Sequence, residues 1–149
     1  MSTTNSTDII GTMGQWFDKF PQLPKNWRDT LARIAPILSL IFGILGIIVA
    51  ISGLGLLTAT SPLAFLGGAQ SVSSYGTGII SVVIYLVGSI LLLAAYPGLK
   101  ARQYKGWKLL FWSEVANLVG GIVSLAILSA IIGALIGFYI IFQIRSYYK

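Results

Sequence analysis

The sequence contains no cysteine and no histidine, and only four of its 149 residues are acidic. Without cysteine there can be no disulfide, no thiolate nucleophile and no S-palmitoylation, and without histidine the side chain most used as a general base is missing. The side chains left to bind a metal ion through a carboxylate are Asp8, Asp18, Asp29 and Glu114. We therefore expect no metal site and no cofactor.

Sequence motifs of hydrolases and nucleotide-binding enzymes are absent as well. The chain has no Gly-x-Ser-x-Gly turn, no His-Glu-x-x-His pair and no Gly-x-x-x-x-Gly-Lys loop. An intramembrane aspartyl protease needs two acids within the membrane, and the apolar part of this chain contains one. We expect that the protein is not an enzyme and has no catalytic residues.

Charged residues make up only 9% of the chain, whereas 56% is hydrophobic and the mean hydropathy is +0.85. About a quarter of a typical soluble domain is charged, so this composition predicts an all-α integral membrane protein. Four apolar stretches are candidate transmembrane helices, at about residues 34–59, 79–96, 109–128 and 131–144. The last two are divided near Ser129 because one helix over 109–142 would be about 51 Å long at ~1.5 Å per residue, against a hydrocarbon core of about 30 Å.

The basic residues predict how these spans are oriented. With four spans all ten basic residues fall on one side, namely Lys19, Lys25, Arg28, Arg33, Lys100, Arg102, Lys105, Lys108, Arg145 and Lys149. This positive-inside pattern predicts a multi-pass protein of the plasma or inner membrane with both termini in the cytoplasm. Topology and attraction to anionic lipid headgroups explain the net charge of +6, so we expect no nucleic-acid partner.

Residues 8–20 predict an amphipathic helix before the first span. Its apolar residues recur at helical spacing and are Ile9, Ile10, Met13, Trp16, Phe17 and Phe20. Such a helix is typical of one that lies in the headgroup layer; the alternative is packing on a partner or on the protein's own loops. The predicted interface anchors are Trp16, Trp27, Trp107 and Trp112. We divide the chain into a cytoplasmic or interfacial segment, residues 1–33, and a four-helix transmembrane domain, residues 34–149.

Small residues recur at four-residue spacing in the second half of the chain. They are Ala116, Gly120 and Ser124, then Ala126, Ala130 and Ala134, then Gly133 and Gly137. In lipid such stripes allow close approach of helices. We interpret them as packing faces of a four-helix bundle, with a dimer face as the alternative.

Glu114 is the one acidic residue after position 29. It lies about 9 Å along the helix axis from Lys108, near the cytoplasmic side, and Asn117 is one turn deeper on the same face. Because polar groups are costly against lipid, this face should point into the bundle. The preferred interpretation is a structural ion pair with Arg33 or a loop lysine. The alternatives are a protonatable site coupled to a substrate, and an unpaired side chain that reaches the interface.

The predicted function follows from these patterns. We expect a non-enzymatic multi-pass membrane protein with a structural or accessory role, acting through helix–helix contacts in a homo-oligomer or larger membrane complex. The alternative is a small proton-coupled transporter or channel subunit that uses Glu114.

Overall fold

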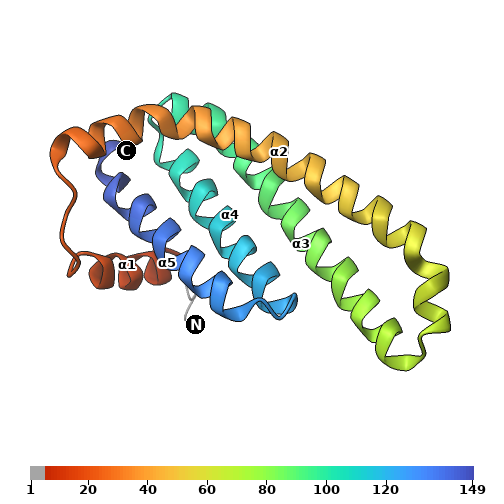
Figure 1. The fold of residues 1–149 in the computed structure, drawn as a ribbon. Coiled ribbons are helices and arrows are strands. Elements are labelled where there is room, and N and C mark those ends of the chain that lie inside the picture. Colours follow the sequence, from red (N-terminus) through yellow and green to blue (C-terminus); the bar gives the residue numbers. More distant parts are fainter. Residues whose placement is uncertain (1–5) are drawn as a thin grey trace, which may run out of the picture.

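The computed structural model describes the chain from residue 6 to residue 149. This part is all-helical and contains no strand; its elements are α1 (Ser6–Phe17), α2 (Lys25–Leu66), α3 (Ala69–Lys100), α4 (Tyr104–Val123), α5 (Ile127–Gln143) and the 3-10 helix η1 (Arg145–Tyr147). Figure 1 shows α2 and α3 as a long antiparallel hairpin, with the shorter hairpin of α4 and α5 beside one half of it. The predicted all-α fold is thus confirmed.

Three helices are long and apolar enough to cross a membrane, where the sequence predicted four. They are α2, α3 and the segment Ile127–Tyr147, which joins α5 and η1. The predicted span at 109–128 corresponds to α4, which does not qualify because Lys108, Glu114 and Asn117 lower its mean hydropathy. Three such helices are compatible with a multi-pass membrane protein.

The long helix α2 is longer than the span predicted from the sequence. It contains the predicted span 34–59, extends beyond it at both ends and includes the proposed domain boundary between residues 33 and 34. Pro36 and Pro62 lie inside it without ending it. A proline leaves the carbonyl four residues earlier without its helical donor, and hydroxyl groups replace the donor in both places. Tyr148 Oη donates to the Ala32 carbonyl (3.2 Å), and Ser61 Oγ donates to the Thr58 carbonyl (2.8 Å).

The turn between α4 and α5 lies at residues 124–126 rather than near Ser129. Leu125 adopts a φ of 61°, and the Ala126 N–H donates to the Gly121 carbonyl (3.0 Å) while the Leu125 N–H donates to that of Ile122 (3.1 Å). This pair of bonds is a Schellman motif. Its left-handed position usually holds glycine, and because leucine stands there the sequence carried no turn signal.

Consecutive helices form the main packing interfaces, in the order α2, α3, α4, α5. The backbones of α3 and α4 come closest at Gly98 and Gly106, where a Cβ atom on Gly98 would lie 2.6 Å from the Gly106 Cα. Part of the predicted small-residue stripe serves this packing, since Gly120 faces the Tyr85 ring and Gly121 faces Ala130. Gly133, by contrast, faces open space.

The C-terminal residues join the helix ends on one side of the bundle. Tyr147 Oη donates to an Asp29 carboxylate oxygen near the start of α2. Lys149 exchanges backbone hydrogen bonds with the turn between α3 and α4, donating to Arg102 (3.2 Å) and accepting from Tyr104 (2.9 Å). The starts of α2 and α4 and the ends of α3 and α5 therefore lie together, which also gathers the basic residues of these segments.

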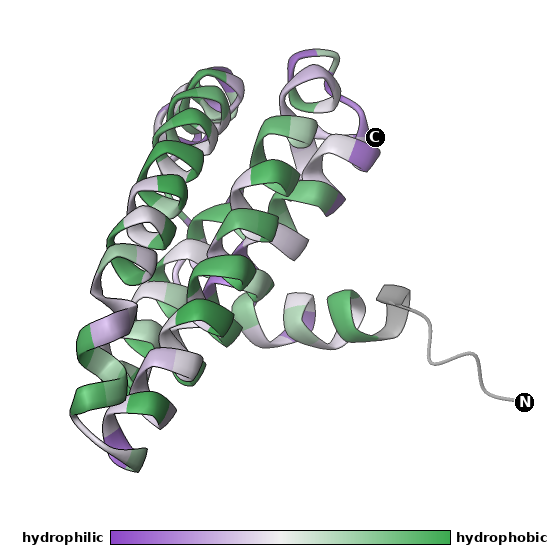
Figure 2. Ribbon diagram, turned by 90° about the vertical axis from the view of Figure 1, so that its right-hand side faces the viewer, coloured by the Kyte–Doolittle hydropathy of each residue, from purple (hydrophilic) through white to green (hydrophobic). Residues whose placement is uncertain are grey.

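The first helix, α1, lies against α5 (Figures 1 and 2). Ile10 is fully buried, and the Phe17 ring stacks on that of Phe142 with centroids 5.2 Å apart. Ile9 and Trp16 of the same predicted apolar stripe are exposed. The stripe is divided between the protein and the outside, so α1 is a helix packed on its own bundle rather than one with its whole apolar face in the headgroup layer.

Candidate functional site

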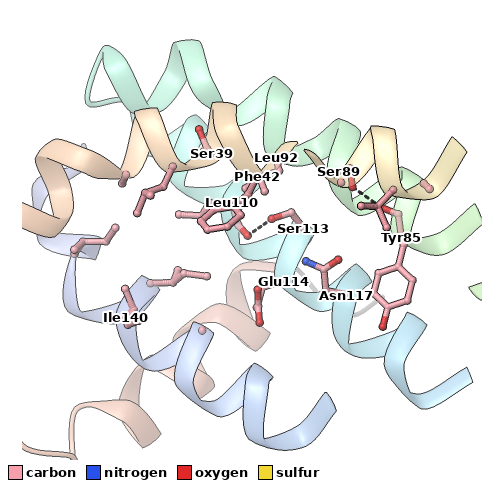
Figure 3. A pocket seen from close by; sticks show the side chains of 18 of the residues that line it. Ser39, Phe42, Tyr85, Ser89, Leu92, Leu110, Ser113, Glu114, Asn117 and Ile140 are labelled. Carbon is pink, nitrogen blue, oxygen red and sulfur yellow. Dashed lines mark hydrogen bonds between the residues drawn. The ribbon is translucent and has the colours of Figure 1, made fainter. Parts of the chain in front are cut away.

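A cavity of about 570 Å³ lies between α2, α3, α4 and α5 (Figure 3). Its volume falls within the range typical of small-molecule sites, about 300–1,000 Å³. Most lining side chains are apolar, and Leu38, Phe42, Leu92, Leu110 and Ile140 are among them. Extensive contacts join only consecutive helices, so α2 and α5 line the cavity with few direct contacts between them.

Most of the α2 wall of the cavity is a single helical stripe, to which Leu31, Leu38 and Ala50 are added at its sides. The stripe consists of Ala35, Ser39, Phe42, Gly46, Val49 and Gly53, which follow each other in alternating steps of four and three residues. Such spacing places side chains on one face of a helix. Four of the six are small, so α2 approaches α3 closely: a Cβ atom on Gly46 would lie 3.0 Å from the Ser89 Cβ. The same small side chains leave space toward α5.

Glu114 projects into this cavity from α4 and is half-buried (Figure 3). Its carboxylate lies over Gly137 of α5, where an added Cβ atom would come within 2.7 Å of the Glu114 Cδ. Gly137 thus provides the room that the carboxylate occupies. No lysine or arginine lines the cavity, and within residues 6–149 no ion pair to Glu114 is formed.

Asn117 lines the cavity one turn beyond Glu114, as the sequence predicted. Its Oδ1 atom lies over Gly88 of α3, 3.0 Å from where a Cβ atom on that glycine would stand. Tyr85 adds a phenol ring to the same wall. The hydroxyls of Ser39 and Ser89 are less available to a ligand, since each donates to a carbonyl of its own helix at 2.8 Å.

Arg33, the third residue of the predicted polar site, is exposed and does not line the cavity. Two lysines near the predicted cytoplasmic boundary also have other neighbours, because Lys100 lies over the Tyr96 ring (5.9 Å) and Lys108 over the Tyr104 ring (5.3 Å). The structure thus brings Glu114 and Asn117 together but not Arg33. The pairing with Arg33 stays a prediction without a contact to support it.

The four tryptophans predicted as interface anchors differ in environment. Trp16 and Trp27 are mostly exposed, as anchors would be. Trp107 is fully buried: its Nε1 donates to the Ile141 carbonyl (2.8 Å), and its ring stacks on Tyr104 with centroids 5.4 Å apart. Trp112 is half-buried against Phe111. Trp107 therefore joins α4 to α5 through its hydrogen bond to Ile141. Because it is fully buried, it does not lie at a membrane interface as an anchor would.

Sequence reasoning missed the α2 wall, Tyr85 and Gly137. The signal for the wall was present, since the four-and-three spacing from Ala35 to Gly53 can be read directly from the chain. The place of Gly137 opposite Glu114 depends on how α5 is rotated against α4, which spacing alone does not give. Within the described residues no cluster of three or more acidic side chains could hold a metal ion.

Comparisons of the chain with models of protein families, with curated proteins and with solved structures found no match. The functional argument therefore rests on the residues of this chain.

Proposed function

We propose that this chain is a non-enzymatic multi-pass membrane protein with a structural or accessory role, acting through lateral helix contacts in an oligomer or larger membrane complex. The observation that carries this proposal is the length of the α2–α3 hairpin. At ~1.5 Å per residue, the 42 residues of α2 span about 63 Å, whereas the 20 residues of α4 span about 30 Å.

The protruding part of the hairpin is uncharged, and its α2 half carries exposed apolar side chains. Counted from Ile34, where the charged residues of α2 end, a hydrocarbon core of about 30 Å is crossed near Gly53. The turn of the α4–α5 hairpin lies at a similar level, since Val82 faces Gly53 and Tyr85 faces Gly121. The exposed large side chains beyond that level include Leu56, Leu63, Phe65 and Leu66. Exposed large apolar side chains that gather in one segment favour an interaction site, and we assign this segment to contact with a protein partner or a second copy.

The proposed arrangement in the membrane has four crossings. If α3 and α5 both cross, α4 must cross between them, because α4 begins and α5 ends at the same side of the bundle. Its polar residues are tolerable there, since Glu114 and Asn117 face the cavity rather than lipid. The basic end of the bundle then lies at the cytoplasmic face of a plasma or inner membrane, against anionic headgroups.

Site-specific photo-crosslinking in the native membrane tests the proposed contacts. A photoreactive amino acid at Leu63, on the protruding hairpin, should give a discrete protein adduct. The matched control is Leu128, which is also exposed but lies near the start of α5, at the edge of the hydrocarbon core rather than beyond it, and it should react with lipid. Lipid adducts alone at Leu63, together with a monomeric protein after mild solubilisation, would contradict the accessory role.

A second candidate function, a small proton-coupled transporter or channel subunit, is favoured by one observation. Glu114 is a carboxylate in a membrane-embedded cavity without a cation beside it, which is the setting of many coupling sites. In sealed vesicles, this function predicts proton-driven uptake that Glu114→Gln abolishes and Asp18→Asn, an exposed control, leaves intact. Uptake that is the same for both variants would contradict it.

A further inference from the structure

The Glu114 cavity combines an apolar wall with a single carboxylate. An ionised carboxylate away from water is costly unless a positive charge or several hydrogen bonds compensate it. Within residues 6–149 neither is supplied, because no basic residue of this part lines the cavity and the nearby serine hydroxyls are engaged by their own helices. A positive charge at this place has to come from outside the described chain.

We propose that this cavity binds a lipophilic organic cation, with its charged group against the Glu114 carboxylate and its apolar body between α2 and α5. This binding site goes beyond the accessory role and does not depend on it. Phe42 and Tyr85 line the same space, and the faces of such rings attract organic cations. The Asn117 amide adds a neutral polar group beside the carboxylate.

The cavity suits a small molecule. Its volume of about 570 Å³ lies within the range typical of small-molecule sites. At the end near the C-terminal residues, Tyr148 bonds to the Ala32 carbonyl, between the cavity residues Leu31 and Ala35. We therefore assign the space to a compact cation, and a helix of a second copy is an outcome that the test below distinguishes.

Two ions of the same shape and opposite charge provide the test. The full-length protein is placed in nanodiscs of phosphatidylcholine, and binding of radiolabelled tetraphenylphosphonium and tetraphenylborate is measured against empty nanodiscs. Wild type should bind the phosphonium saturably and the borate no better than lipid alone. Glu114→Gln should weaken phosphonium binding at least about tenfold, whereas Asp18→Asn, which removes the same charge from an exposed position, should change it little.

A second pair of variants tests the position of the site without touching Glu114. Val49 lines the cavity at its exposed rim, while its neighbour Ile48 is exposed but does not line it. Val49→Trp should reduce phosphonium binding and Ile48→Trp should not. The proposal would be overturned if both ions bound equally, if Glu114→Gln bound the phosphonium as wild type does, or if the two tryptophan variants had equal effects. A photoreactive amino acid placed at Val49 provides one more test, because a cross-link there between two copies of the chain would also overturn the proposal. None of these outcomes bears on cross-linking at Leu63, so the two proposals fail separately.

Discussion

At the scale of single residues, one tyrosine and one proline explain how α2 continues through a residue that usually ends a helix. Pro36 removes the helical donor for the Ala32 carbonyl, and Tyr148 supplies another from the far end of the chain. Burial raises the pKa of the Tyr148 hydroxyl, while Arg102 opposes the shift, so the group remains a protonated donor at neutral pH. The bond therefore links the last residues of the chain to α2.

We expect Tyr148→Phe to lower the free energy of unfolding by about 1–3 kcal/mol, since it leaves a buried carbonyl without a donor. In a Pro36→Ala background the restored N–H can bond to Ala32, so the same substitution should cost distinctly less. Thermal unfolding in detergent of the two single variants and the double variant gives this coupling. Strictly additive effects would show that the hydroxyl does not replace the missing N–H.

Glu114 provides a second prediction at this scale. Because no cationic side chain of the described residues lies beside it in the cavity, Glu114→Gln should melt no lower than wild type, as a neutral amide is cheaper to bury than a carboxylate. A structural ion pair would give the opposite result, a loss of up to ~3–5 kcal/mol. Arg33→Gln and Glu114→Gln should then be additive within about 0.5 kcal/mol. Coupling between them would restore the pairing predicted from the sequence.

The sequence placed the two polar residues of α4 in this cavity but not the residues around them. Helical spacing was enough to place Glu114 and Asn117 on one inward face, because both lie on a single helix. Arg33 and Gly137 lie on other helices, and which of them meets Glu114 depends on how those helices are rotated. Rotation is set by side-chain packing over the whole bundle, and no local pattern encodes it.

At the scale of helices, the glycines divide into those that packing requires and those that face outward. Gly106 meets Gly98 backbone to backbone, and a Cβ atom on Gly106 would lie 2.7 Å from the Gly98 Cα. Gly133 has nothing within 4 Å of its Cβ position. Both lie inside helices, where the change from glycine to alanine otherwise favours the helix by about 0.5–1 kcal/mol.

We therefore expect Gly106→Ala to destabilise the protein by more than about 2 kcal/mol, since backbone atoms cannot move aside as a flexible side chain can. Gly133→Ala should be neutral or slightly stabilising. Thermal unfolding of both variants in the same detergent measures the difference. Similar stabilities would mean that α3 and α4 are not in contact at Gly98.

Helix boundaries could be predicted where the charge or polarity of the sequence changes. They could not be predicted where backbone hydrogen bonds determine whether a helix ends. The apolar stretches placed the cores of α2, α3 and α5 correctly. The predicted first span ends at residue 59, but α2 continues through Pro62 because Ser61 donates to the carbonyl that the proline leaves without a donor. The turn at Leu125 was missed for a related reason, since its stability comes from two backbone hydrogen bonds rather than from glycine.

At the scale of the whole molecule, the two ends of the helical bundle differ in charge. The C-terminal residues bond to the start of α2 and to the turn after α3, so all helix ends with basic residues are gathered on one side. The opposite end, at residues 67–78 of the α2–α3 hairpin, carries no charge. From this asymmetry we expect the basic side to lie in the cytoplasm.

The absence of cysteine makes the orientation directly measurable, because the unaltered chain gives no background with thiol reagents. Ser74 and Gln103 are both exposed and lie at opposite ends of α3. In intact cells an impermeant maleimide should label Ser74→Cys and not Gln103→Cys, and permeabilisation should make both reactive. Labelling of Gln103→Cys from outside would invert the orientation. Labelling of both sites in intact cells would mean that α3 does not cross the membrane, and the four-crossing arrangement would then be wrong.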